Sequence, residues 1–140
     1  MKTSELTGAA LDWAVAKCEG ATDFWFDTVA TYWVKLNGED RALRYGWAQA
    51  YLPSTDWSQG GPIIEREGID LECHLGYWAS SLWPNKPTTV TPVNAAKYRI
   101  GRIKLSIRAN GPTPLIAAMR CYVASKLGDD VEVPEAICNQ

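Results

Sequence analysis

A short segment in the middle of the chain gathers two hydroxyls, a carboxylate and a large aromatic surface: Ser54, Thr55, Asp56 and Trp57. Gly60 and Gly61 follow, and paired glycines let backbone N–H groups approach an anion at a helix N-terminus. The same side chains can instead satisfy their own backbone in an Asx or ST turn, with the indole packed beneath it. We favour the turn, because the glycines lack the following Lys and Ser/Thr of a phosphate-binding loop.

His74, the only histidine, directly follows Cys73. Neighbouring residues of a strand point to opposite faces, so these two side chains cannot hold one metal ion from a regular strand. A zinc site of ordinary ligand spacing would need another histidine. His74 could meet Cys18 or Cys121 from elsewhere in the chain, but the apolar neighbours of these thiols are typical of core positions. We therefore predict no metal site, no cofactor and no catalytic residues, and a protein that is not an enzyme.

One stretch of the chain carries five basic residues and no acidic one: Lys97, Arg99, Arg102, Lys104 and Arg108. They could present a charged face to RNA, DNA or an acidic partner, with Tyr98 available for stacking. Alternatively, they pair with Asp70 and Glu72 across a sheet or protect an edge strand by their charge. We favour these structural roles, because the formal net charge of −2 opposes a polyanion. No sequence-specific nucleic acid partner is expected.

Trp78 and Trp83 lie in a segment that also holds Tyr77 and leads into a proline-rich stretch. Aromatic side chains on a surface loop can anchor a partner protein or a second copy of the chain. They can equally cover one open end of a small core. Both interpretations stay open, and the first of them includes a homodimer.

Three segments carry the start and stop signals of helices. The first spans Thr7–Gly20, with the threonine as N-cap and the glycine as a left-handed stop. The second has Pro62 at its first position and ends at Gly68. The third spans Thr113–Gly128, again with an N-cap threonine and a terminal glycine. Its apolar stripe follows helical spacing and comprises Ile116, Met119, Val123 and Leu127.

Strand patterns alternate with these helices. Thr28–Leu36 is rich in β-branched and aromatic residues, and Asn37-Gly38 after it is a hairpin turn signal. Asp70–Leu75 and Arg102–Arg108 alternate between apolar and charged residues, so we predict antiparallel neighbours with opposite charges facing each other. The predicted inward side chains are Leu71, Cys73, Leu75, Ile103, Leu105 and Ile107.

The length of 140 residues suits one domain, which we place at 1–140, with a proline-rich surface loop at 83–95. No apolar run approaches the ~18 residues of a membrane span. The four cysteines lack C-x-x-C spacing, so we expect reduced thiols and an intracellular protein. The predicted fold class is α+β: a small, mostly antiparallel sheet packed by three helices, with the last predicted helix central to the core.

Three blocks of sequence carry a resemblance to a known family: residues 11–20, Pro53–Ile69 and Gly111–Pro134. They are similar to the NinX-like family of small tailed-phage and prophage proteins, related to the phage alpha-beta-alpha sandwich domain. The resemblance implies an accessory gene product in the bacterial host cytoplasm, with no established activity and no catalytic residues to carry over. Residues 21–50 and 76–100 depart from the family's shorter members and look like an insertion or a subfamily extension, and we expect a β-rich insertion at 21–50.

These observations predict a phage or prophage accessory protein that binds a host protein or modulates a host process. The contact surface is expected at Trp78–Trp83 or at the basic stretch. The alternative is a protein that binds or sequesters a small, nucleotide-like molecule, built around Ser54–Gly61 and Thr113. Its partner is thus a host protein or a small molecule, and no membrane is involved.

Overall fold

Five α-helices and six strands make up the part of the chain that the computed structural model describes, residues 1–27, 30–89, 91–93 and 95–138. The helices are α1 (Gly8–Cys18), α2 (Trp57–Glu67), α3 (Ala95–Leu105), α4 (Pro114–Leu127) and α5 (Glu135–Cys138), preceded by the 3-10 turn η1 (Thr3–Glu5). The strands are β1 (Asp23–Phe26), β2 (Tyr32–Leu36), β3 (Glu39–Ala42), β4 (Asp70–His74), β5 (Tyr77–Leu82) and β6 (Ile107–Gly111). None of these helices is both long and apolar enough to cross a membrane.

The described strands form two antiparallel sheets of three strands each, β1-β2-β3 and β4-β5-β6. In the first sheet, Asn37 and Gly38 adopt φ values of 54° and 81° and turn β2 into β3, as the hairpin signal predicts. The α+β class is therefore confirmed, with the strands divided between two sheets. Thr28 and Val29 of the predicted first strand lie outside the described residues, as do Val90 and Asn94 of the predicted loop.

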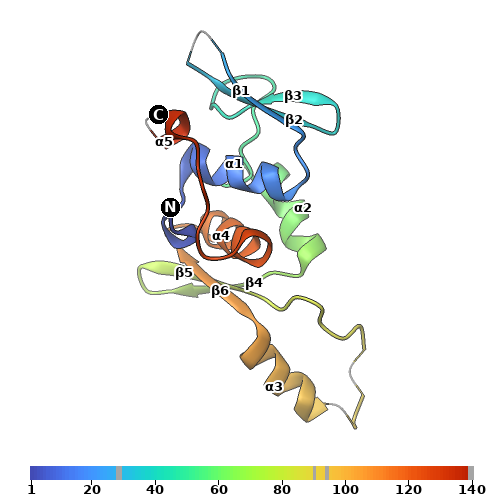
Figure 1. Cartoon of the computed structure of the whole chain (residues 1–140). Coiled ribbons are helices and arrows are strands. Elements are labelled where there is room, and N and C mark those ends of the chain that lie inside the picture. Colours follow the sequence, from blue (N-terminus) through green and yellow to red (C-terminus); the bar gives the residue numbers. More distant parts are fainter. Residues whose placement is uncertain (28–29, 90, 94, 139–140) are drawn as a thin grey trace.

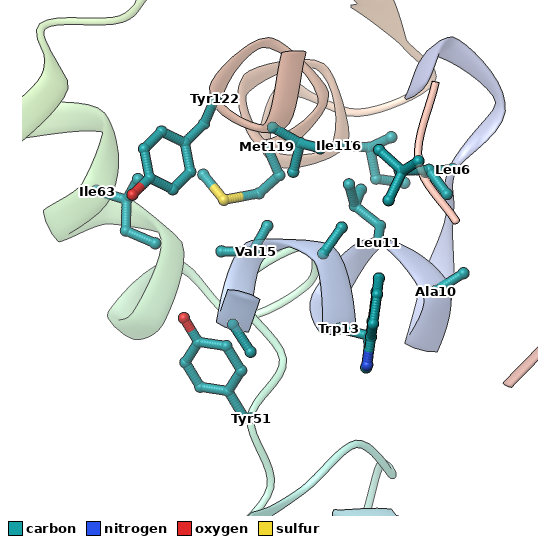
Figure 2. Packing of buried hydrophobic residues seen from close by; sticks show 14 of the residues in the cluster. Leu6, Ala10, Leu11, Trp13, Val15, Tyr51, Ile63, Ile116, Met119 and Tyr122 are labelled. Carbon is teal, nitrogen blue, oxygen red and sulfur yellow. The ribbon is translucent and has the colours of Figure 1, made fainter. Parts of the chain in front are cut away.

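Helix α4 occupies the centre of the molecule (Figure 1). It lies on one face of the β4-β5-β6 sheet, α1 packs against its other side, and α2 flanks it. The first sheet lies beyond α1. Figure 2 shows Ile116 and Met119 of α4 directed toward α1, whose Leu11 and Val15 meet them. The main core is thus the space between these two helices.

Helix α1 is buried on every side because it lies between α4 and the first sheet. All residues from Ala10 to Ala16 are buried, and Trp13 contacts Phe24 of β1 with 5.6 Å between ring centroids. A helix whose middle turns are buried all round belongs inside a core, and Asp12 is the one charged residue within this buried stretch. The predicted helix is confirmed, although the side chain of Thr7, at the N-cap position, makes no capping hydrogen bond.

Helix α4 begins and ends where the sequence predicts. The Ile116 N–H donates to Thr113 Oγ1 at 3.2 Å, and Pro114 occupies the first helical position. Gly128 follows the last turn. Met119 on the predicted stripe is 0% exposed. These local signals agree with the tertiary structure, and the central position of this helix is confirmed.

Helix α2 starts earlier than predicted. The Asp56 carboxylate accepts from the Ser58 N–H at 2.9 Å and caps the helix, which therefore begins at Trp57. Pro62 lies inside the helix, where its missing N–H leaves the carbonyl of the exposed Ser58 without a helical donor. The prediction of Pro62 as the first residue is wrong, because a strong N-cap outweighed the proline signal. The predicted stop is confirmed, since Gly68 has φ 65°.

Helix α3 replaces most of the predicted strand Arg102–Arg108, so that prediction is wrong. The segment 95–105 is rich in Ala, Lys, Arg and Leu, which favour helix, and the seven alternating residues 102–108 were too few to outweigh them. Ile103 and Leu105, predicted to point inward, are 64% and 62% exposed. The strand that pairs with β5 is β6, which comes later in the chain. Gly111 in β6 allows α4 to approach closely, since an added Cβ there would lie 2.7 Å from the Ala117 nitrogen.

Strand β4 keeps the predicted alternation but not the predicted burial. Leu71 packs against the core, whereas Cys73 is exposed and Leu75, in the turn that follows, is 102% exposed. Burial fails here because the β4-β5 hairpin runs on beyond the part of the sheet that α4 covers. β4 is not paired with the basic segment either: its neighbour is β5. Opposite charges still meet, since Arg102 of α3 pairs with Asp70 at 2.7 Å.

Candidate functional site

A cavity of about 760 Å³ lies where the start of α1 meets the segments before α2. Its walls come from Gly8 and Ala9 of α1, from residues 43–45, and from Leu52 together with residues 55–57. Asp12 of α1 also lines it, and we call this cavity the Asp12 pocket. Three of the predicted site residues, Thr55, Asp56 and Trp57, are thereby brought to one cavity wall.

Asp12 is the residue of this pocket that the sequence analysis missed. It is 1% exposed, and its Oδ1 accepts from the Ser54 N–H at 2.9 Å. Burial raises the pKa of this carboxyl from 3.8 to about 7, against the opposing effect of hydrogen bonding from Ser54. A carboxyl of this kind in a cavity is a functional candidate on physical grounds. The available signal was one carboxylate within the apolar run of residues 9–16.

Asp56 has a structural task at the rim of the pocket. Its carboxylate accepts from the Ser58 N–H and hydroxyl at 2.9 and 2.7 Å and from Gln59 Nε2 at 3.1 Å. These hydrogen bonds, chiefly those from Ser58, lower its pKa below the ordinary value. The favoured interpretation of the 54–57 segment as a turn that satisfies its own backbone therefore has direct structural support at Asp56. The expectation that the indole packs beneath the turn is wrong, because Trp57 is 54% exposed.

The remaining hydroxyls of the predicted site lie around a second, smaller cavity. This cleft of about 210 Å³ brings Ser54, Thr55 and Trp57 together with Thr113 at the start of α4. Ser54 is 1% exposed, and its Oγ has no hydrogen-bond partner among the described residues. Thr113 is engaged in capping α4. The sequence thus grouped residues that meet in space, although they divide between two cavities that share Thr55 and Trp57.

Gly60 and Gly61 do not form the anion-binding loop that their pairing suggested, because both lie within α2. The Gly60 N–H donates to the Asp56 carbonyl at 2.9 Å. A Cβ at Gly60 would lie 2.4 Å from the Pro53 carbonyl oxygen and 2.7 Å from Leu115 Cδ2. Gly60 is therefore required for close packing, whereas a Cβ at Gly61 would make only an ordinary contact, 3.9 Å from Trp57 Cε3.

Trp78 and Trp83 do not share a surface loop, because residues 77–82 form the central strand β5. Trp78 is half-buried opposite Cys73 and Gly111. Trp83 packs against α3, with its ring centroid 5.0 Å from that of Tyr98. The loop prediction is wrong for Trp78, since the strand pattern of β5 was overlooked beside the prolines that follow it. Trp83 follows β5 directly and has no regular secondary structure, as expected for the start of the predicted loop.

A second large hollow, of about 670 Å³, lies between α3 and the face of the β4-β5-β6 sheet turned away from α4. We call it the α3 groove. Arg99, Arg102 and Ile103 line it from the helix, and Glu72 and Arg108 from the sheet. The Glu72 carboxylate lies 3.2 Å from His74 Nε2, and Asp70 pairs with Arg102. Among the described residues, Arg99 and Arg108 have no carboxylate partner, nor do Lys97 and Lys104.

The thiols and the histidine do not come together. His74 contacts Glu72 and stacks on Tyr77, whose ring centroid is 4.8 Å away. The Cys121 thiol donates to the Ile107 carbonyl, and burial raises its pKa to about 11. Burial also raises the pKa of Cys18 to about 12. Within the described ranges, no group of three or more His, Cys, Asp and Glu could hold a metal ion.

The chain matches the family model described as Bacteriophage P22, NinX, over residues 2–126. The match includes both sheets, α1 to α3 and nearly all of α4, and therefore both the Asp12 pocket and the α3 groove. Comparison with curated proteins finds no match. A match over nearly the whole chain identifies the family predicted from the three sequence blocks: this protein belongs to the Bacteriophage P22 NinX family.

Proposed function

We propose that this protein is a phage accessory protein that acts by binding an acidic host protein through α3, and that it is not an enzyme. Family membership supports the phage setting. The observation that carries the proposal is α3 itself: it has eleven residues and none of them is buried. A helix with no fully buried residue contributes little to the core, so most of its side chains are available to a partner.

The chemistry of α3 favours an acidic, partly apolar partner. Ile100 and Ile103 are 53% and 64% exposed, and Lys97, Arg99 and Lys104 are exposed around them. A helix that exposes apolar and basic residues together can dock the apolar ones in a groove of a partner while its charges select that partner. The host cytoplasm is the proposed place of action, because a phage protein of this kind would meet host proteins there.

Two contacts fix α3 to the rest of the protein and leave its exposed side chains accessible to a partner. The first is close packing of the Trp83 indole against α3, since a Cβ at Gly101 would lie 2.8 Å from Trp83 Cζ2. The second is the Arg102–Asp70 ion pair, which fixes α3 to β4. The arrangement supports a preformed recognition helix, which loses less conformational entropy on binding than a disordered segment.

The test compares the wild-type protein with a double variant, Lys97→Glu with Lys104→Glu, as bait in infected host cells. The matched control carries the same charge change on other helices, Lys17→Glu with Lys126→Glu. We expect an acidic host protein to be retained by the wild type and the control and lost by the α3 variant, with the interaction reproduced between purified proteins. Equal retention by all three baits, or retention of nucleic acid alone, would contradict the proposal.

A further inference from the structure

The Asp12 pocket combines apolar and aromatic walls with one buried carboxyl group. Leu43 is 2% exposed and belongs to the core, whereas Tyr45 and Trp57 are 88% and 54% exposed. Aromatic side chains left this open at the wall of a cavity are a common feature of ligand sites. The cavity of about 760 Å³ falls in the size range of small-molecule sites.

The charges around the pocket favour a cation. Asp56 is held in its ionised form by the hydrogen bonds of its capping role, and Arg44 donates to the Thr31 hydroxyl at 3.2 Å. Asp12 hydrogen-bonds only to Ser54 among the described residues, so its carboxyl retains acceptor capacity. An incoming anion would meet two acidic groups and one arginine that already has a partner. An incoming cation would offset the excess of acidic groups, Asp12 and Asp56, over the single arginine.

We propose that the Asp12 pocket binds an organic monocation, with an ammonium or guanidinium group paired to Asp12 and an apolar body against Tyr45 and Trp57. The aromatic faces attract a cation as well as an apolar surface. A free amine and a lysine or arginine side chain of a bound protein present the same head group. The proposal concerns other elements than α3 and does not depend on the function proposed for that helix.

Asp12 gives the site a pH dependence that identifies the binding mode. Burial holds its pKa near 7, and the cation pairs with the ionised form. The other titratable or charged groups near it are Tyr45, Tyr51, Asp56 and Arg44, and hydrogen bonds from Ser58 lower the pKa of Asp56 below its ordinary value. Affinity for a monocation should therefore rise about tenfold per pH unit from pH 5 to pH 7 and level off above.

The probes are phenethylammonium, 2-phenylethanol and phenylacetate, which share a ring but differ in charge, and an N-acetylated lysine amide. Binding is followed by NMR titration of the full chain at pH 5, 6, 7 and 8. We expect phenethylammonium to bind with the stated pH dependence and to lower the pKa of Asp12, and the alcohol and the carboxylate to bind at least tenfold more weakly at pH 8. Tighter binding of the lysine amide would assign the head group to a protein side chain, and tighter binding of the amine would assign it to a small molecule.

Two variants locate the site. Asp12→Asn keeps an acceptor for the Ser54 N–H and should abolish the pH dependence and weaken phenethylammonium binding at pH 8 at least tenfold. Tyr45→Ala removes an exposed side chain and should weaken binding several-fold at an unchanged melting temperature, so it serves even if Asp12→Asn folds poorly. Tyr77→Ala in the α3 groove is the matched control. Affinity that does not change with pH, equal or tighter binding of phenylacetate, or wild-type affinity of Tyr45→Ala would overturn the proposal.

Discussion

The Asp12 pocket and the α3 groove are hollows of similar volume, about 760 and 670 Å³, but they are built differently. The pocket is lined by the core residue Leu43 and by the exposed Tyr45 and Trp57, and its carboxyl group, on Asp12, is 1% exposed. One wall of the groove is α3, a helix with no buried residue. Substitution of the buried Asp12 should therefore affect stability and binding together, whereas substitutions of the exposed Tyr45 or on α3 can change binding alone.

The contrast also concerns charge. Burial of Asp12 makes its ionisation dependent on the fold, since its pKa is raised to about 7. The basic residues of α3 lie in solvent, where salt screens them and single ion pairs contribute little to stability. The same physical cause, the depth of the side chain, explains why the pocket suits one selective charged contact and the helix suits many weak ones.

The largest expected effect comes from Met119→Asp, at the centre of the core that supports the pocket. An unpaired carboxylate at a position 0% exposed should cost more than about 4 kcal/mol and unfold the domain. Ser125→Asp is the control on the same helix, because this side chain is only partly buried and its hydroxyl bonds to the Tyr122 carbonyl of its own turn. Circular dichroism with thermal melting makes the comparison, and equal melting temperatures would show that the core is assigned to the wrong face.

Asp12→Asn tests whether the buried carboxyl governs stability. The folded-state pKa of about 7 lies above the ordinary 3.8, so the stabilising contribution of the protonated form is complete below about pH 4 and is lost as the pH rises through 7. The free energy of unfolding should fall by about 1.4 kcal/mol per pH unit within that window. Denaturant unfolding of wild type and variant from pH 4 to 8 measures the difference, and parallel pH profiles would refute the raised pKa.

Gly60→Ala and Gly61→Ala form a matched pair beside the pocket. The added methyl at residue 60 meets the Pro53 carbonyl oxygen and should cost about 1–3 kcal/mol. The methyl at residue 61 meets open space and ordinary contacts, so it should stabilise the helix by about 0.5–1 kcal/mol. Denaturant melts compare the two, and the same sign for both would contradict the packing role of Gly60.

Asp56→Ala should lower the melting temperature by a few degrees, because it removes the acceptor that caps α2. Asp56→Asn should restore most of the loss, since asparagine is an equally good N-cap. If Asp56→Ala left the melting temperature unchanged or raised it, we would instead assign this carboxylate to ligand binding, because functional groups are often held at the expense of stability.

The smallest effect on stability is expected on α3. Lys97→Glu with Lys104→Glu should leave the free energy of unfolding within about 0.5 kcal/mol of wild type, because both side chains are exposed and unpaired in the described structure. The wild type should bind double-stranded DNA only weakly and with strong salt dependence, since the net charge is −2. Submicromolar binding near 0.2 M salt would make the basic stretch a nucleic-acid surface and remove the contrast between the two hollows.

The sequence by itself determined the features that depend on neighbouring residues. The cap and stop of α4 at Thr113 and Gly128, the hairpin at Asn37-Gly38 and the left-handed stop at Gly68 all follow from local conformational preferences. The fold class was likewise accessible, because it rests on such local patterns taken together, and the family was accessible through the resemblance of three sequence blocks. The single-domain boundary and the insertion at 21–50 stay predictions.

Only the tertiary structure determined which side chains are buried, because the residues that bury them come from segments distant in the sequence. Asp12 is buried where it contacts Ser54, in a loop 42 residues away, and no pattern of neighbouring residues predicts that contact. The alternation around Ile103 suited a strand as well as a helix, and in the fold the place beside β5 is taken by β6 instead. Long-range packing, which sets burial and thereby pKa, is the physical reason that the pocket and the groove emerged only from the folded chain.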